Sequence, residues 1–234
     1  MTGTALNVAA VLAGGALGTV LRQRLPEKTR QTVLHGLGLV TLVVGLQMAL
    51  DTTSMLVLMG SVLLGGILGE WWRIEQRMEA IGDSLQQRMG AGTSGTVAQG
   101  FVTASLIFCV GPMTILGSIQ DGLTGDYSLL AIKSLLDGFA ALALASSLGV
   151  GVLLSIVTIL AYQGLLTVLA SLVQTAISPA LMTEMTAAGG VIIMGIGLVL
   201  LDIKRIRVGN LLPAMFIAPL IVAVLIALGI RATP

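Results

Sequence analysis

Charged residues are scarce in this sequence, and their scarcity limits what the protein can be. Only 10% of the 234 residues are charged, whereas 56% are hydrophobic and the mean hydropathy is +1.01. An ordinary globular domain has about 25% charged residues, which help it to cover an apolar core. The composition therefore argues against a soluble enzyme or a disordered chain. The net charge of +1 supplies no basic field, so we expect no nucleic-acid partner.

Residues used in metal and redox chemistry are equally few. The single cysteine, Cys109, and the single histidine, His35, allow no internal disulfide and no ligand pair at metal spacing. The sequence also lacks the G-x-x-x-x-G-K-[ST], G-x-S-x-G and H-E-x-x-H patterns of nucleotide-binding, hydrolase and metalloprotease sites. We therefore expect no metal, no cofactor and no enzymatic activity.

Long apolar runs dominate the chain instead. A helix needs about 20 mostly apolar residues to cross a bilayer. Eight runs meet or approach that length: 5–21, 32–50, 55–71, 97–117, 129–147, 152–173, 185–202 and 210–230. The nearly continuous run from 128 to 173 reads as two helices that turn near the small residues 146–151, or alternatively as one long kinked helix. The sequence thus predicts an all-α, polytopic membrane protein with about eight transmembrane helices.

Basic residues support the count of eight crossings. With eight spans, one side of the membrane carries the loops 22–31, 72–96, 148–151 and 203–209, which hold ten of the 12 Lys and Arg residues. The other side carries only Arg231, and Lys133 lies within a span. Because cytoplasmic loops are enriched in Lys and Arg, this split predicts that both termini are extracytoplasmic.

The linker between the third and fourth spans has a pattern of its own. Apolar residues recur at helical spacing through 72–90, which predicts an amphipathic helix on the inner leaflet or, alternatively, a docking helix for a partner subunit. Gly90–Gly95 would form a flexible connection after it.

Two pairs of spans show internal similarity. Val11–Leu21 matches Ile159–Leu169 at six of eleven positions, and Gly38 and Gly45 align with Gly190 and Gly197 after a four-residue shift. Five crossings separate the first span from the sixth, so the two units would enter the membrane from opposite sides. This arrangement is an inverted-topology repeat, which is common in secondary transporters. It divides the chain into the three-helix repeats 1–71 and 152–234, with the linker 72–96 and a two-helix unit 97–151 between them.

Charged residues inside the spans are the first candidates for function, because charge in a bilayer is costly. Lys133 and Asp137 lie four residues apart on one helix face, so they predict either a substrate or coupling-ion site or a structural ion pair. Further polar residues would line the route: Gln120, Asp121, Tyr162, Gln163 and Asn210.

Prolines predict interrupted helices in the fourth and eighth spans. Pro112, after Gly111, lacks a backbone donor and clashes with the preceding turn, as do Pro213 and Pro219 in the last span. Freed carbonyls at such breaks are tolerated only beside protein or water. We therefore assign these four residues to helix breaks or gating.

Several of these segments resemble one known family. The resemblance rests on 101–125 (FVTASLIFCVGPMTILGSIQDGLTG), 133–138 (KSLLDG), 162–164 (YQG), 210–214 (NLLPA) and 24–27 (RLPE). The chain is similar over essentially its whole length to the YqgA/YdfK-like proteins of the bacterial inner membrane, a domain-of-unknown-function family. This resemblance implies an integral inner-membrane protein and supplies no substrate.

Together these features favour a secondary transporter or exchanger of a small polar or ionic solute. A small-ion channel and a non-transporting membrane scaffold or regulator are the alternatives. The expected partners are the lipid bilayer and the solute, and the glycine-rich faces are compatible with a homodimer.

Overall fold

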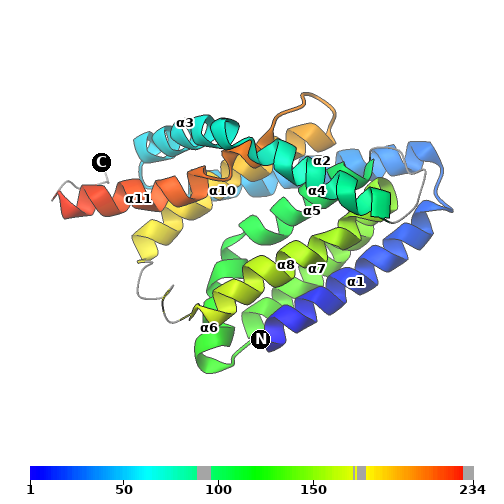
Figure 1. Ribbon diagram of the computed structural model, residues 1–234, viewed down its shortest axis with the longest axis horizontal. Helices are drawn as coiled ribbons and strands as arrows, with labels where there is room; N and C mark the ends of the chain where they lie inside the picture. The colour runs from blue at the N-terminus through cyan, green and yellow to red at the C-terminus, as the bar shows by residue number, and fades with distance from the viewer. Residues whose placement is uncertain (89–95, 171, 173–177, 229–234) are drawn as a thin grey trace. The chain divides into compact units, whose positions relative to one another are not determined.

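The computed structural model describes residues 1–88, 96–170, 172 and 178–228. Within that part of the chain the regular structure is helical throughout (Figure 1), as the sequence predicts. In chain order the helices are α1 (Thr2–Arg22), α2 (Glu27–Leu50), α3 (Met55–Trp72), α4 (Ile74–Arg88), α5 (Thr96–Val110), α6 (Pro112–Thr124), α7 (Ser128–Leu148), α8 (Gly151–Val168), α10 (Pro179–Leu200), the 3-10 helix η1 (Val208–Leu211) and α11 (Ala214–Ala227).

Seven helical segments of this part of the chain are long and apolar enough to cross a membrane, and the bent pair α5–α6 makes eight if it is counted as one span. The predicted two-helix reading of 128–173 is confirmed, because α7 ends at Leu148 and Gly149 turns the chain with a φ of 82°. The seventh span begins earlier than predicted, since Ser178 caps α10 and Pro179 occupies its first position. The predicted ends of the sixth and eighth spans, Val173 and Ile230, lie outside the described residues.

The predicted linker helix is confirmed as α4, which follows α3 after Arg73. Arg73 has a φ of 53°, in the left-handed region where a helix ends. The predicted connection Gly90–Gly95 lies outside the described residues.

The chain folds into two compact units that do not follow its order. One unit comprises Met1–Leu37 and Met78–Thr175, and the other comprises Gly38–Arg77 and Ala176–Pro234. We call them the first and the second unit. Each unit therefore combines segments from both halves of the sequence, and the predicted division into consecutive repeats stays a prediction.

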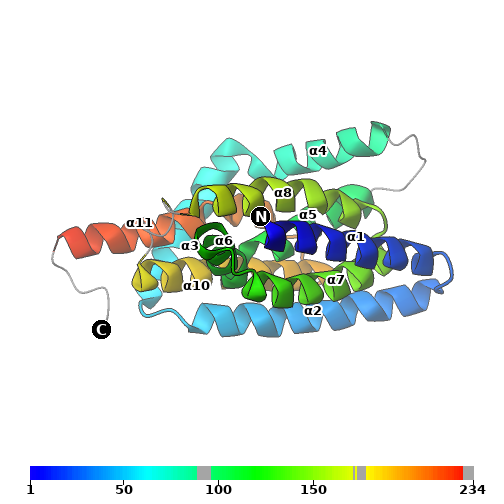
Figure 2. The same cartoon turned by 90° about the horizontal axis from the view of Figure 1, so that it is seen from below.

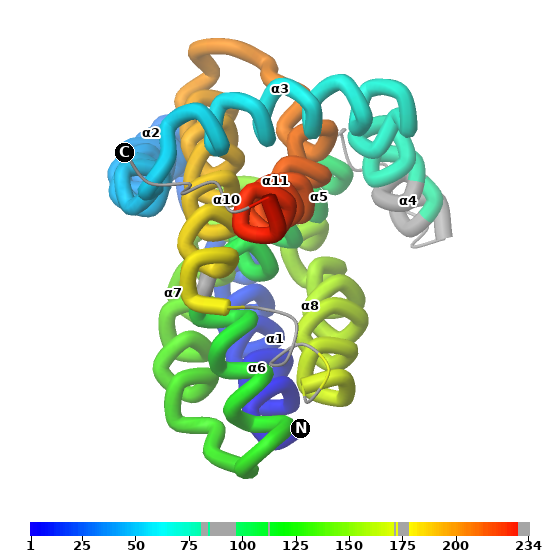
Figure 3. The backbone as a smooth tube through the Cα atoms, turned by 90° about the vertical axis from the view of Figure 1, so that its left-hand side faces the viewer, coloured from blue at the N-terminus to red at the C-terminus, as the bar shows by residue number. Residues whose placement is uncertain are grey.

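In the first unit, α1 and α7 pack backbone to backbone and run in the same direction (Figures 2 and 3). A β-carbon at Gly14 would collide with the carbonyl of Gly138, and one at Gly18 would collide with the carbonyl of Leu142. Only glycine permits this approach, which is typical of helix pairs in membranes. The close contact fixes which side chains of α1 face α7.

The bent pair α5–α6 follows α8 over its whole length. Val97 near the start of α5 contacts Gly151 at the start of α8, and Gly122 near the end of α6 contacts Thr167 near the end of α8. The two helices are bent by 61° at the break, where Gly111 is extended and Pro112 opens α6. The predicted interruption is thus confirmed, and the pair spans the same thickness as one full helix.

In the second unit, α2 and α10 pack through four glycines. A β-carbon at Gly45 would lie 2.7 Å from the carbonyl oxygen of Gly190, and one at Gly190 would lie 2.6 Å from that of Gly45. Gly38 and Gly197 oppose each other in the same way, at 3.1 and 2.9 Å. These are the four glycines that the sequence alignment pairs. The glycines of α2 contact α10 in the same way as the glycines of α10 contact α2.

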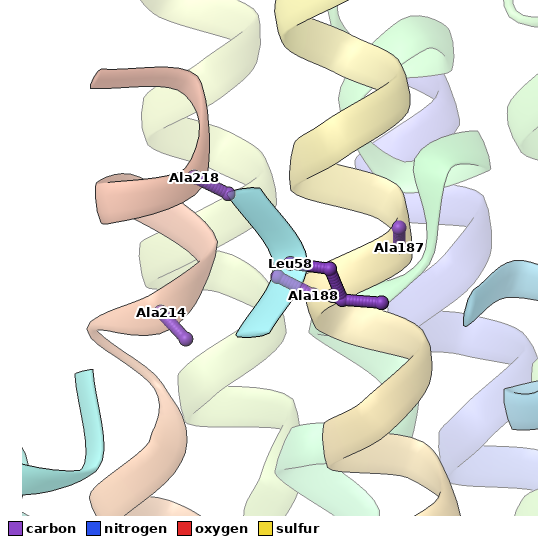
Figure 4. Packing of buried hydrophobic residues seen from close by; sticks show 5 residues of the cluster. All are labelled: Leu58, Ala187, Ala188, Ala214 and Ala218. Carbon is purple, nitrogen blue, oxygen red and sulfur yellow. The ribbon is translucent and has the colours of Figure 1, made fainter. Parts of the chain in front are cut away.

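Small residues also bring α3 against α10 and α11. Leu58 of α3 lies among four alanines of the other two helices, as Figure 4 shows: Ala187, Ala188, Ala214 and Ala218. Since alanine leaves little side chain between backbones, these helices approach closely and leave their large apolar side chains facing outward. Leu56, Ile67 and Leu220 are more than 60% exposed, as expected for surfaces that contact lipid.

Candidate functional site

Lys133 and Asp137 form a buried ion pair on α7. Their side chains are only 6% and 10% exposed, and the Lys133 ammonium donates to Asp137 Oδ2. At 1.5 Å per residue, the two residues lie about 8 and 14 Å along the helix from Ser128. Because the apolar core of a bilayer is about 30 Å thick, Asp137 lies near its middle. The predicted pairing of these two residues on one helix face is confirmed.

Two amides from neighbouring helices complete this site. Asn7 of α1 donates from Nδ2 to Asp137 Oδ2 at 3.0 Å and to Gln163 Oε1 of α8 at 2.9 Å. Asn7 is fully buried and Gln163 is 1% exposed. We call Asn7, Lys133, Asp137 and Gln163 the polar cluster. Three helices therefore bring one cation, one carboxylate and two amides together inside the membrane.

One atom of the polar cluster has no hydrogen-bond partner. Asn7 Oδ1 is buried and accepts no hydrogen bond from the described residues. The orientation of the amide follows from its neighbours, because its nitrogen faces two acceptors and an oxygen there would be repelled. A buried acceptor without a donor costs roughly 1–3 kcal/mol, so the cluster is short of one electropositive group.

A line of polar side chains continues from the cluster toward the N-terminal end of α1. Gln163 Nε2 donates to Thr4 Oγ1 at 3.3 Å, and Thr4 Oγ1 lies 3.4 Å from Thr167 Oγ1. Thr4 and Thr167 are buried. In the opposite direction, α1, α7 and α8 bury mainly apolar side chains, such as Val11, Leu144 and Val152. Ser146, Ser147 and Ser155 are also buried in that direction, and each donates to a backbone carbonyl.

Asp121 lies at that end of the first unit, in a different setting from the predicted one. The sequence places Gln120 and Asp121 in a loop after a span ending at 117, whereas α6 continues to Thr124 because Gly125 provides its left-handed cap. Asp121 is 4% exposed and binds the Met1 ammonium at 2.9 Å and the Gly3 amide at 3.1 Å. Gln120 is not beside the cluster and instead donates to the exposed Asp126 at 2.7 Å.

The end of α5, just before the helix break, carries Cys109. Cys109, two residues before Gly111, is within electrostatic reach of both Lys133 and Asp137. Tyr162 of α8, half-buried, is in turn within reach of Cys109. The roles predicted for Tyr162 on the solute route and for Gly111 in gating stay predictions.

Asn210 belongs to the second unit and to another set of contacts. Its Nδ2 donates to Glu70 Oε2 at 2.7 Å, and its Oδ1 accepts from the Glu75 amide at 2.8 Å. Glu75 also accepts from the Gly209 amide at 2.6 Å, and Arg207 pairs with Glu70. These contacts hold η1 against the end of α3 and the start of α4.

The break in the last span lies ahead of Pro213, and Pro219 interrupts nothing. η1 ends at Leu211, Pro213 caps the start of α11, and α11 continues through Pro219 to Ala227. The predicted break at Pro213 is confirmed. Pro219 is a proline within a continuous helix, so its assignment to a helix break is wrong.

A third buried carboxylate among the described residues escapes sequence reasoning altogether. Glu184 of α10 is 1% exposed and accepts from Thr52 Oγ1 at 2.7 Å, Thr53 N at 2.7 Å and Thr53 Oγ1 at 2.8 Å. It holds the turn between α2 and α3. Since the predicted span begins at 185, the sequence places Glu184 in a loop, and no spacing links it to Thr52 or Thr53.

Comparisons with known proteins identify related sequences. Residues 2–223 match the family described as "Protein of unknown function (DUF554)". The "Uncharacterized membrane protein YdfK" of Bacillus subtilis is 29% identical over 235 residues, covering 99% of this chain and 100% of the relative. The "Uncharacterized protein YqgA" of Escherichia coli is 32% identical over 220 residues, covering 92% and 94% of the two chains. No solved structure matches the chain significantly.

Proposed function

The chain belongs to the DUF554 family of proteins of unknown function, and for this membrane protein we propose secondary transport of a small polar or ionic solute. The proposal places the solute site at the polar cluster. Asp137 is the carboxylate whose charge or occupancy changes during the cycle, and Lys133 is its partner.

The observation that carries the proposal is a buried ion pair that retains an unpartnered acceptor. A charged side chain at the centre of a helix in a bilayer costs roughly 2.5–3.5 kcal/mol by insertion scales. Replacing a buried ion pair with apolar residues of similar volume is often neutral or stabilising. A purely structural cross-link would also satisfy the buried amide, whereas Asn7 Oδ1 has no donor among the described residues. A site that takes up a further group explains both features.

Two elements support transport over a static pore or scaffold. The 61° break between α5 and α6 follows Cys109, which is within electrostatic reach of Lys133 and Asp137, and a helix interruption leaves backbone carbonyls free to bind a solute. The glycine contacts between α2 and α10 are reciprocal, and this symmetry agrees with the inverted-topology repeat expected from the sequence. In transporters such repeats alternate the access of a central site.

We also propose that the protein resides in a bacterial inner membrane with both termini outside the cytoplasm. The support is the distribution of basic residues along the sequence, ten of which fall in the segments predicted to connect spans on one side of the membrane. In this orientation Thr4, Thr167 and Asp121 lie toward the extracytoplasmic end of the first unit, where all three are buried.

The test is solute-driven flux in proteoliposomes that contain the pH indicator pyranine. Vesicles are challenged with separate gradients of alkali-metal chlorides, small amines and small carboxylates, with protein-free vesicles as the background. We expect at least one class to give a saturable pH change with the wild type. Asp137→Asn should reduce its rate at least tenfold, because the variant removes the charge that responds to the solute.

The matched control is Asp126→Asn, which makes the same chemical change at an exposed carboxylate between α6 and α7. Its flux should equal that of the wild type. Equal flux and equal pH dependence in Asp137→Asn and Asp126→Asn would show that the assignment of Asp137 is wrong.

A further inference from the structure

Two arginines come together at the end of the first unit where α1 ends, α2 begins and α7 ends (Figure 2). Arg22 is the last residue of α1, and Arg30 lies in the first turn of α2. Both contact the end of α7, because Ser147 Oγ donates to the backbone oxygen of Arg30 at 3.1 Å and the Arg22 guanidinium lies against Gly149. The two arginine side chains are within electrostatic reach of each other. We call Arg22 and Arg30 the arginine pair.

Gly149 makes room for one member of the arginine pair. A β-carbon at this position would collide with Nη1 of Arg22. The backbone of Gly149 also has a φ of 82°, which side chains rarely permit. The guanidinium therefore occupies the space that a side chain would fill, and the turn between α7 and α8 holds it in place.

The charges of this region are not balanced. Glu27 pairs with Arg30, whereas no ion pair or hydrogen bond joins the Arg22 side chain to another described residue. Two guanidinium groups and one carboxylate leave a charge of +1. In addition, Nε of Arg30 is buried and has no acceptor among the described residues. Because unpaired donors of a charged group are costly, the arginine pair lacks an anionic acceptor.

The position of the arginine pair indicates where that acceptor comes from. α1 has 21 residues, which span about 30 Å at 1.5 Å per residue. This length equals the thickness of the apolar core of a bilayer. Arg22, at the end of α1, therefore lies at the level of the lipid headgroups. Phosphate oxygens at that level match the fork of N–H donors that a guanidinium presents.

Charge distinguishes between the classes of phospholipid. A zwitterionic headgroup carries its own cation beside the phosphate, so its binding would leave the charge of +1 in place. A headgroup with a net charge of −1 cancels it. An anionic phospholipid is therefore the better match, since attraction between basic residues and anionic lipids adds to the hydrogen bonds.

We propose that the arginine pair binds the phosphate of one anionic phospholipid, such as phosphatidylglycerol. The inference goes beyond the proposed function and does not depend on it. Because Arg22 belongs to α1 and Arg30 to α2, a phosphate bound by both links these helices at the end of α7. Bound lipid should therefore stabilise the folded protein.

The experiment measures thermal unfolding of the purified full-length protein in a neutral detergent. Short-chain phosphatidylglycerol, short-chain phosphatidylcholine and sodium phosphate are added separately, at equal concentration and equal ionic strength. Phosphatidylglycerol at a hundredfold excess over its dissociation constant should raise the melting temperature by about 5–10 °C. Phosphatidylcholine and sodium phosphate should have little effect.

Arg22→Gln tests whether the effect comes from this site. The variant should need at least about ten times more phosphatidylglycerol for half of the maximal shift. Arg24→Gln is the matched control, because it makes the same change at an exposed arginine of the same connection, and it should respond as the wild type. Arg22→Lys keeps the charge but loses the fork of donors. It should weaken the response severalfold, and it replaces Arg22→Gln if that variant does not fold.

Three results would overturn the inference. Equal shifts with phosphatidylglycerol and phosphatidylcholine would show that the headgroup charge is not recognised. An equal shift with sodium phosphate would reject the lipid and identify soluble phosphate as the ligand. Equal lipid responses of Arg22→Gln and Arg24→Gln, with a lower melting temperature of Arg22→Gln in the absence of lipid, would mean that Arg22 only stabilises the carboxyl end of α7. Flux in proteoliposomes is measured separately, so each proposal can fail without the other.

Discussion

Three buried carboxylates of this protein are stabilised in three different ways. Asp137 has the Lys133 ammonium, Asp121 has the Met1 ammonium, and Glu184 has neutral donors from Thr52 and Thr53. Among the described residues, a buried acceptor without a partner accompanies only Asp137, and that acceptor is Asn7 Oδ1. This difference is why we assign the binding site to Asp137 and a structural role to Glu184.

Glu184→Ala tests that structural role. The change leaves the Thr52 and Thr53 donors of the α2–α3 turn without their acceptor, which should lower the free energy of unfolding by about 2–3 kcal/mol. The melting temperature in detergent should fall by about 4–10 °C for a chain of this size, with flux per folded protein unchanged. Glu79→Ala, at an exposed position of α4, should shift it by no more than about 1–2 °C. Equal shifts in the two variants would contradict the role of Glu184.

Sequence reasoning finds those residues of the site that are energetically costly to place in a membrane span. Lys133 and Asp137 are found because charges in apolar runs are rare and costly. Asn7 is not found, since a single amide near the start of a span is ordinary, and only the packing of α1 on α7 shows that it reaches Asp137. Asn210 is predicted to line the solute route, and in the structure it donates to Glu70 in the second unit.

At the scale of the helices, backbone contacts between glycines determine the pairing. Gly45 and Gly190 place α2 and α10 so close that neither position has room for a β-carbon. Spans themselves follow from length and hydropathy, so the sequence predicts them well. Their exact ends depend on caps, as at Ser178 and Gly125, and the extension of α6 to Thr124 is what removes Asp121 from the predicted loop.

Two alanine substitutions on α2 test the importance of this contact. Gly45→Ala places a methyl group 2.6 Å from Met194 N and 2.7 Å from Gly190 O, and overpacking of this kind costs about 1–3 kcal/mol. Gly36→Ala on the same helix meets nothing within 4 Å and should be neutral or stabilising by up to about 1 kcal/mol. Thermal unfolding in detergent measures both. Similar melting temperatures for the two variants would mean that α2 and α10 do not pack in this way.

At the scale of the whole molecule, the placement of ten basic residues predicts eight crossings. The described residues contain seven candidate spans, or eight if the bent pair α5–α6 is counted as one. Contacts of this pair with both ends of α8 are those expected of a single crossing. The composition of the two units could not be predicted, because each unit joins segments distant in sequence whose contacts leave no periodic signal.

The central claim is that the Lys133–Asp137 pair binds a solute and is not a cross-link. The most direct test is pyranine-detected flux in proteoliposomes carrying the double variant Lys133→Met/Asp137→Leu, which replaces both charges with apolar side chains of similar size. Such replacements of buried ion pairs are often neutral or stabilising. We predict a melting temperature at or above that of the wild type, with flux reduced to that of protein-free vesicles. Wild-type flux in the double variant would contradict the account.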